Sequence, residues 1–240
     1  MSYSFSLLSK IVVVPSLDES LRLEIFDHLI LFYENKELDE WGWGEPLLSA
    51  AIQLIHTTEE KNRMLKILNE INPTEEYWDW NYRAAQELML QLITVTEDST
   101  AVYNYLINNI TNPDFREQLI TQAIKSKEYT KALTWANEGM VESDKEGENK
   151  RWERLQLNIY EQLKDKKNII RLTSSFIIDS FELPRKEDYN LLKKNIPAES
   201  WNKHLDQMLA EIIKKKDGYS YEKRVSLYIW EKSWAKYLVL

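Results

Sequence analysis

The side chains of this sequence that could do acid–base or metal chemistry are three histidines and several groups of acidic residues. Glu24 and His28 are one helical turn apart, so a carboxylate and an imidazole there could share a metal ion. A metal site needs at least three converging ligands, and His56 and His204 stand far away in the sequence. A packed or solvated role for each histidine therefore competes with a metal site, and we predict no metal and no cofactor.

An acidic segment over residues 37–45 could bind a cation or supply an acid–base pair. Its members are Glu37, Asp39, Glu40 and Glu45. Their spacing does not match an EF-hand loop, which places its oxygen ligands at fixed positions. The sequence also contains no phosphate-binding glycine loop, no G-x-S-x-G, no H-E-x-x-H and no Cys. We therefore favour a solvated acidic loop and predict no catalytic residue.

Aromatic side chains are the second group that could carry function, because the chain has nine Trp. Trp41 and Trp43 alternate with glycines, and residues 77–82 hold four aromatic side chains. Trp and Tyr offer large contact areas with few rotatable bonds, which favours a binding surface, but large aromatic residues also pack in cores. The possible partner-binding residues are Trp41, Trp43, Trp78, Trp80, Tyr160, Tyr189 and Tyr228.

The composition favours long helices with short connections. The chain has 240 residues, 43% of them hydrophobic, but only 5 Gly and 6 Pro. No apolar run reaches the roughly 18 residues that a membrane span needs, and no basic residue precedes the apolar N-terminal runs as a secretory signal requires. With no Cys, a reducing compartment suits the chain. We expect a cytoplasmic protein that does not bind a membrane.

Charge is divided unevenly along the chain. Residues 1–110 carry 18 acidic and 7 basic side chains, a net charge of −11, whereas residues 111–240 carry 21 and 24, a net charge of +3. The first segment should repel nucleic-acid phosphates, and the second is nearly balanced. We expect one helical domain over 1–240, with a possible subdivision into an acidic, irregular part (1–110) and a part of repeated hairpins (111–240).

Helix starts recur at short intervals along the chain. Capping boxes are expected at Ser16 with Glu19 and at Thr57 with Glu60, and Asp98 or Ser99 can cap a later helix. The apolar stripe expected for the first helix is Leu21, Ile25, Leu29 and Phe32; for a helix over 198–216 it is Trp201, Leu205, Met208, Leu209 and Ile212. The polar segment 141–150 is expected to be a surface loop.

The C-terminal half repeats itself. Residues 125–135 align with residues 162–172, so that Lys127 matches Lys164, 37 positions later. A third copy over 230–240 places Lys232 68 positions beyond Lys164, and half of 68 is 34. Helix, polar turn and second helix returning at this period predict a stack of helical hairpins.

These residues resemble tetratricopeptide repeats. The segment EYTKALTWANEGM resembles the second helix of that repeat, with Ala132, Ala136 and Gly139 at its small-residue positions; the next copy has Ile169, Thr173 and Phe176 there. The resemblance implies an all-α fold, an α-α superhelix of stacked antiparallel helical hairpins. It also implies a scaffold that binds a protein or peptide.

A second resemblance covers most of the chain. The segments ELDEWGWGEPL, NPDFREQLITQAIKSKEYTKAL and WERLQLNIYEQLKDKKNIIRL are similar to the helical region that follows SWIM-type zinc fingers in uncharacterised bacterial proteins. The zinc finger itself is absent, because the chain has no Cys ligands. No metal or nucleic-acid role is therefore inferred from that family.

Three functional hypotheses follow. The first is a non-enzymatic helical-repeat scaffold for protein–protein interaction, with a groove lined by residues such as Asn158, Tyr160, Tyr189 or Tyr228. The second is an enzyme or metal-binding protein with an unrecognised carboxylate and His pocket. The third is nucleic-acid binding through the C-terminal half. The apolar C-terminal end, Leu238 to Leu240, either docks on the preceding hairpin or pairs with a second copy of the chain.

Overall fold

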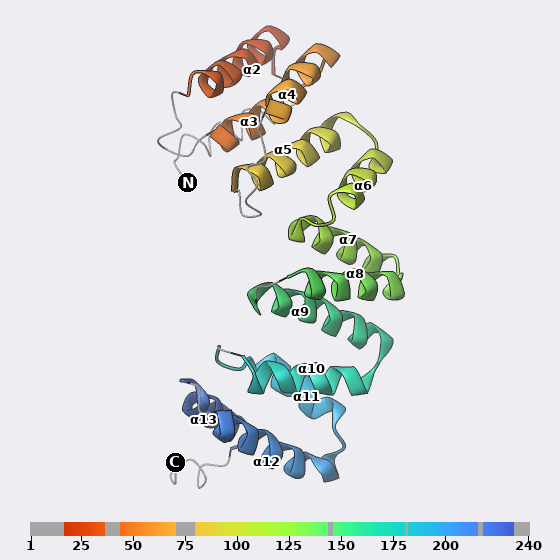
Figure 1. Ribbon diagram of the computed structural model, residues 1–240, viewed down its shortest axis with the longest axis vertical. Helices are drawn as coiled ribbons and strands as arrows, with labels where there is room; N and C mark the ends of the chain where they lie inside the picture. Colours follow the sequence, from red (N-terminus) through yellow and green to blue (C-terminus); the bar gives the residue numbers. More distant parts are fainter. Residues whose placement is uncertain are drawn as a thin grey trace. The chain divides into compact units, whose positions relative to one another are not determined.

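The fold is all-α, as the sequence predicts. The computed structural model describes residues 17–36, 44–70, 80–143, 146–180, 182–215 and 218–232, and over these ranges it contains α-helices and no strand (Figure 1). The chain packs as two compact units, Met1–Phe115 and Arg116–Leu240. Each unit has its own core.

The helices of the first unit are α2 (Glu19–Glu34), α3 (Gly44–Ile52), α4 (Thr58–Glu70), α5 (Trp80–Thr96) and α6 (Ser99–Asn108). Helix α7 (Pro113–Lys125) begins just before the boundary. The second unit continues with α8 (Tyr129–Glu142), α9 (Glu146–Leu163), α10 (Lys166–Ile178), α11 (Lys186–Asn195), α12 (Ala198–Lys215) and α13 (Ser220–Trp230).

Side-chain caps fix where several helices begin. The capping box at Thr57 and Glu60 is confirmed: the Thr57 amide donates to Glu60 Oε2 (3.0 Å), and the Glu60 amide donates to Thr57 Oγ1 (3.3 Å). Asp98 caps α6 as expected, accepting from the amides of Thr100 and Ala101. Ser16 lies outside the described residues, and α2 is capped by Asp18 instead.

The expected apolar stripe of α2 was correct at Ile25 and Leu29, which are partly buried and buried in the core, and wrong at its two ends. Leu21 and Phe32 are 46% and 38% exposed, whereas Arg22, Phe26, Leu29 and Ile30 are buried. Helix α2 is apolar around most of its circumference, so hydrophobic periodicity alone does not select the buried face. The face is selected by Arg22, a charged residue that the pattern would place in solvent.

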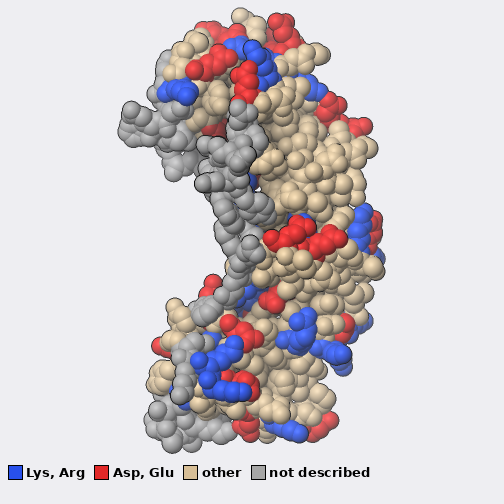
Figure 2. Space-filling model, in the orientation of Figure 1, with Lys and Arg blue, Asp and Glu red and all other residues tan. Residues whose placement is uncertain are grey.

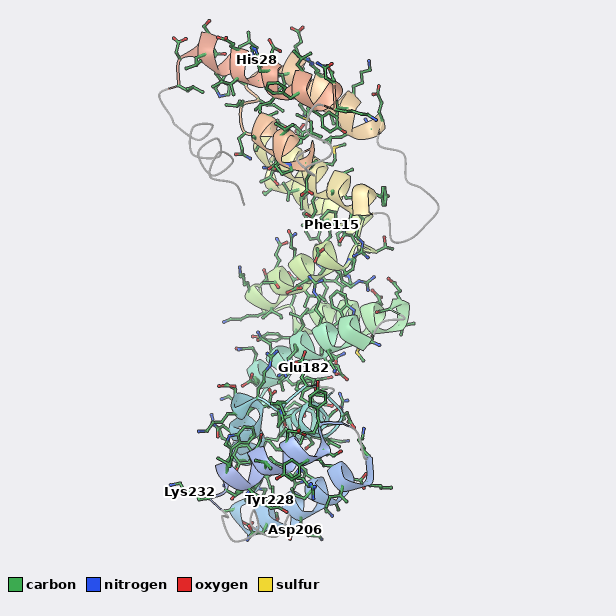
Figure 3. All side chains as sticks on the ribbon, turned by 90° about the vertical axis from the view of Figure 1, so that its left-hand side faces the viewer. His28, Phe115, Glu182, Asp206, Tyr228 and Lys232 are labelled. Atoms are coloured by element: carbon green, nitrogen blue, oxygen red, sulfur yellow. The ribbon has the colours of Figure 1, made fainter. Side chains whose placement is uncertain are left out.

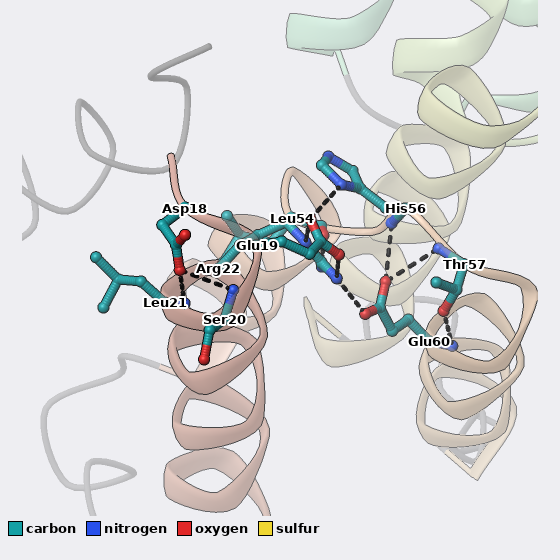
Figure 4. A network of polar contacts seen from close by, with 9 residues as sticks. All are labelled: Asp18, Glu19, Ser20, Leu21, Arg22, Leu54, His56, Thr57 and Glu60. Carbon is teal, nitrogen blue, oxygen red and sulfur yellow. Dashed lines mark hydrogen bonds and ion pairs between the residues drawn. The ribbon is translucent and has the colours of Figure 1, made fainter. Parts of the chain in front are cut away.

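Arg22 joins three segments of the first unit (Figure 4). Its Nη2 donates to Glu60 Oε1 on α4 (2.7 Å), and its Nη1 donates to the carbonyl of Leu54. The Arg22 and Glu60 side chains are only 3% and 7% exposed. Burial alone would raise the pKa of Glu60, but hydrogen bonds from Arg22 and from the amides of His56 and Thr57 outweigh it and lower that pKa.

Replacing Arg22 by Met should lower the free energy of unfolding by about 3 kcal/mol or more, because Glu60 would remain buried without its counter-charge. Denaturant unfolding at pH 7 measures the change. Arg63→Met is the control: Arg63 makes an exposed ion pair with Asp27, and its loss should cost about 1 kcal/mol or less.

The effect of Arg22→Met should depend on pH. The lowered pKa of Glu60 stabilises the wild type above the ordinary carboxyl pKa, and this stabilisation is lost as pH falls through the folded-state pKa. In the variant, Glu60 is protonated more readily. The difference in unfolding free energy between wild type and variant should therefore shrink below about pH 4.5. An undiminished difference at pH 3.5 would contradict the role assigned to Glu60.

Two helices of the second unit, α7 and α9, end in the same way. Lys127 and Lys164 have positive φ angles of 61° and 56°. The next amides, of Glu128 and Asp165, donate back to the carbonyls of Ala123 (2.8 Å) and Tyr160 (2.9 Å). These bonds are those of a Schellman helix end. Lys232 has the same conformation (φ 54°), but so does Lys36 at the end of α2, so the conformation marks a helix end rather than a repeat by itself.

Alternate helices of the second unit contact one another through charged side chains. Arg151 on α9 pairs with Glu117 on α7, and Arg154 on α9 pairs with Asp188 on α11. Each pair joins residues 34 positions apart. Farther on, Glu231 at the end of α13 accepts hydrogen bonds from side chains of α11 and α12. Helices α7, α9, α11 and α13 are thus linked in series.

The predicted stripe of α12 is confirmed, since all five of its members are buried: Trp201, Leu205, Met208, Leu209 and Ile212. The prediction of a surface loop over 141–150 was wrong, because α8 extends to Glu142 and α9 begins at Glu146. Glu and Lys make up half of that segment, and these residues make a solvated helix end as readily as a loop. Only 143–145 separate the two helices.

Gly139 allows α8 and α9 to pack closely. A Cβ at this position would lie 2.8 Å from Trp152 Cε2 and 2.9 Å from Arg116 Cδ. Both of these side chains are 2% exposed and are enclosed by other residues, so neither can move aside without opening the core. The close approach therefore requires glycine.

Gly139→Ala should destabilise the protein by up to about 2 kcal/mol. The overpacking cost of about 1–3 kcal/mol exceeds the helix-propensity gain of about 1 kcal/mol. Gly147→Ala in α9 is the matched control, because nothing lies within 4 Å of a Cβ there. Thermal unfolding should show a lower Tm for the first variant and an equal or higher Tm for the second. A higher Tm for Gly139→Ala would show that the packing is looser than described.

Candidate partner-binding pocket

The second unit contains a cavity of about 440 Å³ between the first turns of α9, the C-terminal half of α10 and the segment that leads into α11. Glu182, an exposed member of its lining, is labelled in Figure 3. Basic, acidic and hydroxyl side chains all line the cavity, and Phe176 supplies an aromatic wall. Most of the lining residues are therefore of charged or polar type.

Two of the basic lining residues are held by structural partners. Arg154 makes a bidentate pair with Asp188, in which Nη2 lies 2.7 Å from Oδ2 and Nη1 donates to Oδ1. Its guanidinium also lies 3.9 Å from the centre of the Phe176 ring. Arg151 pairs with Glu117 on α7. These contacts fix two cations in the wall and direct them towards residues of the protein itself.

The acidic lining residues differ in their surroundings. Asp179 accepts a hydrogen bond from Ser175 Oγ (2.9 Å) and pairs with Lys215. Glu153 is half-buried. Burial raises the pKa of Glu153, and the charge of Asp179 adds to this, against opposing effects of Arg171, Lys150 and Arg154. The cavity lining therefore contains one carboxyl group, that of Glu153, whose charged form is destabilised by loss of hydration.

One amide in the cavity also has an unused acceptor. Asn149 Oδ1 is buried, and no hydrogen-bond donor among the described residues reaches it. Buried polar atoms without a partner are rare in folded proteins. Asn149 and Glu153 are one turn apart on α9, so both acceptors lie on the same side of that helix.

The histidines do not form the predicted alternative site. His28 Nδ1 lies 2.8 Å from the backbone carbonyl of Glu24, not its carboxylate. His56 lies beside Glu19 at the surface, and His204 contacts Ser174 Oγ (3.2 Å). Over the described residues, no three His, Asp or Glu side chains are grouped so that they could hold a metal ion.

Most of the aromatic and acidic residues singled out from the sequence cannot be placed. Trp41, Trp43 and Trp78 lie outside the described residues, as do Glu37, Asp39 and Glu40. Trp80 begins α5, but its side chain is not described. Glu45 lies in the first turn of α3. The proposal that these Trp residues bind a partner stays a prediction.

The three tyrosines differ in their surroundings, and none of them lines the cavity. Tyr160 is half-buried against the cluster around Leu172, and Tyr228, labelled in Figure 3, is half-buried on α13. Tyr189 is only 3% exposed. Tyr189 was expected to line a groove surface, but its side chain is buried in the core.

Tyr189 belongs to a polar cluster that ties α11, α12 and α13 together. Its hydroxyl donates to Glu231, which also accepts from Lys193 Nζ (2.7 Å) and Trp201 Nε1 (2.8 Å). Burial would raise the pKa of Glu231, but these three donors outweigh it and lower that pKa. Burial, together with the bond to Glu231, raises the pKa of Tyr189.

The pocket residues were not singled out from the sequence. The available signal was the spacing of charges: Arg151 and Arg154 each have an acidic residue 34 positions away, at Glu117 and Asp188. That spacing is close to the offsets of 37 and 34 between the aligned copies. It predicts contacts between successive repeats, although it does not reveal the acceptors of Asn149 and Glu153.

Comparisons of the chain with protein-family models, curated proteins and solved structures gave no match. Among the described helices, none is long and apolar enough to cross a membrane.

Tyr189→Phe should lower the free energy of unfolding by about 1.5 kcal/mol, because Glu231 would lose one of its three side-chain donors in a partly buried site. Tyr228→Phe is the control. It removes the same hydroxyl from a half-buried tyrosine of the neighbouring helix and should change stability by about 0.5 kcal/mol or less. Equal effects in urea unfolding would contradict the bridging role of Tyr189.

Proposed function

We propose that the protein is a non-enzymatic helical-repeat scaffold that binds a protein or peptide partner at the pocket of its second unit. The observation that carries this proposal is the cavity itself, which presents side chains of both charges from two helices and the segment between α10 and α11. Surfaces of mixed charge with a few fixed polar groups suit recognition of a polypeptide. The fixed Arg154 and Phe176 give the cavity a rigid wall.

A tetratricopeptide-like arrangement of the second unit is part of the proposal. Three observations support it: ion pairs 34 positions apart link alternate helices, Lys127 and Lys164 end helices in the same conformation, and matching positions of the aligned copies are buried. These positions are Ala132, Ala136 and Gly139 in one copy and Ile169, Thr173 and Phe176 in the next. In such stacks each hairpin buries its apolar face on its neighbours.

An enzymatic role is the second candidate, and one observation favours it. Glu153 is a carboxyl group with a raised pKa in a cavity, as a general acid often is. The hydroxyl nearest to a carboxylate in the lining, that of Ser175, donates to Asp179, and no histidine lines the cavity. An activated nucleophile needs a base that accepts its proton, which a carboxylate already paired with Lys215 does poorly.

Nucleic-acid binding through the second unit has less support. On the face of this unit shown in Figure 2, Lys and Arg side chains lie beside Asp and Glu side chains. Phosphate backbones are bound by clustered cations whose charge is not neutralised nearby. Arg151, Arg154 and Lys215 each have a carboxylate partner.

The scaffold function can be tested with a photo-crosslinking amino acid in place of Arg185, an exposed lining residue. Partners crosslinked in cells and then purified should bind the wild-type chain in solution. Arg185→Glu should weaken that binding about tenfold or more, because a charge reversal at the rim converts an attraction into a repulsion. Lys203→Glu, an equal reversal at an exposed site on α12, should leave the affinity unchanged.

Equal losses in the two variants would show a general effect of charge and not of the pocket. An unchanged affinity in Arg185→Glu would place the partner elsewhere on the chain.

A further inference from the structure

Helix α2 of the first unit has an apolar side that the core of this unit does not bury. Leu21, Leu31 and Phe32 on that side are 46%, 47% and 38% exposed. Spacings of three, four and seven residues bring their neighbours onto the same side of the helix. The resulting set, which we call the outer face of α2, consists of Leu21, Glu24, Ile25, His28, Leu31 and Phe32.

The outer face is directed away from the helices that pack on α2. In the view of Figure 1, α2 lies at the top edge of its unit, with α3 and α5 below it. The Leu21 side chain points away from Leu54 and Glu60 (Figure 4). His28, labelled in Figure 3, lies at the same edge, and its ring centre is 6.4 Å from that of Phe32. Contiguous apolar patches on a protein surface mark sites of interaction, so this face is a candidate interface.

The surface around this face is acidic. Helices α2 and α3 together contain five Asp or Glu residues and one Lys or Arg residue, Arg22, which is buried. Arg22 is shared by two carboxylates, those of Glu19 and Glu60. Glu24 lies within the outer face and is exposed. The net negative charge of these helices favours a positively charged partner.

Arg63 of α4 does not reverse this charge. Its guanidinium pairs with Asp27 (2.7 Å) and Glu34 (3.7 Å), so two carboxylates again share one cation. Helical spacing places both of these acids on the flank of α2 opposite to Leu21. Neither pair involves Glu24.

We propose that the outer face of α2 binds a basic amphipathic helix of a partner protein. This surface lies in the first unit, and the inference does not rest on the pocket of the second unit. Apolar residues at positions i, i+4, i+7 and i+11 form a ridge that can pack against the apolar side of another helix. From Leu21 to Phe32 the ridge is about 16 Å long, which corresponds to about three turns of the partner helix. Lys or Arg residues beside the apolar side of that helix would meet Glu24.

A second copy of this chain fits the same face less well. Pairing two outer faces would bring Glu24 and the other acids of one copy against those of the other. Like charges opposed across an interface weaken binding, whereas Lys or Arg at the same places would strengthen it. The charge of the face therefore favours a basic partner over self-association.

The test uses a fluorescein-labelled peptide, Ac-LKKLLKKLLKKLLK-NH2, whose Leu residues lie on one side of a helix. Its binding to the full chain is measured by fluorescence anisotropy. Two further peptides separate charge from shape. The acidic analogue, Ac-LEELLEELLEELLE-NH2, should bind at least about tenfold more weakly, because its charge is repelled. The alternating peptide, Ac-LKLKLKLKLKLKLK-NH2, has the same composition without an apolar helix side, and it should also bind at least about tenfold more weakly.

Variants of the full chain locate the binding site. Leu21→Ser and Leu31→Ser should each weaken binding of the basic amphipathic peptide about tenfold, because apolar contact area is lost. Val141→Ser is the matched control, since Val141 is an apolar residue on α8 that is 86% exposed. Glu24→Lys should also weaken binding about tenfold. Its control is Glu161→Lys, the same charge reversal at an exposed residue of α9, which should leave the affinity unchanged.

The variants should stay folded, because the replaced side chains are exposed. Leu21→Ser and Leu31→Ser should lower the Tm by no more than about 3 °C. A larger loss would show that the free chain already packs against these side chains, and it would overturn the inference.

Two other results would also overturn it. One is an affinity that is the same for the basic and acidic peptides, or the same in Leu31→Ser as in Val141→Ser. The other is a dimer in sedimentation equilibrium that dissociates in Leu31→Ser, because the face would then be occupied by a second copy of the chain. Loss of partner binding in Arg185→Glu concerns the pocket alone, so the two proposals can fail separately.

Discussion

The bidentate pair between Arg154 and Asp188 is the contact on which the second unit's pocket depends. It joins α9 to α11 and holds the Arg154 guanidinium 3.9 Å from the centre of the Phe176 ring, so that one cation both spaces two helices and forms a wall. Asp188 is buried and would be costly to leave without a counter-charge.

Buried charge plays the same organising part in both units. Arg22 reaches across to Glu60 and Leu54 and so determines which face of α2 is buried, while Glu231 gathers donors from two helices at the end of α13. Apolar packing holds these helices together, but it is tolerant of rotation and sliding. Hydrogen-bonded ions are not, because each donor must meet its acceptor within a few tenths of an ångström. The register of the helices is therefore set by a few polar side chains.

The sequence predicted the fold class and many helix ends, because caps such as Thr57 with Glu60 and stripes such as that of α12 are local patterns. It failed for α2, where apolar residues surround the helix and the deciding contact comes from Glu60, 38 positions away. The pocket was missed for a similar reason. Asn149 and Glu153 look like ordinary polar residues of a solvated segment, and their lack of donors is visible only once α10 and α11 are packed beside them. Tyr189 was expected to line a groove, but its hydrogen bond to Glu231 joins residues 42 positions apart and is visible only in the packed structure.

The use of lysine at the left-handed helix ends has a consequence for the unfolded chain. Glycine is the usual choice there, and a residue with a Cβ costs roughly 1 kcal/mol of strain. Two effects of lysine offset part of that strain. Its positive charge interacts favourably with the negative end of the helix dipole. Its backbone also samples fewer conformations in the unfolded chain than that of glycine. At Lys127 and Lys164, strain in the native turn is therefore partly offset, because the denatured chain has less conformational entropy to lose on folding. The conformational entropy lost when these two turns form is therefore smaller than it would be with glycine.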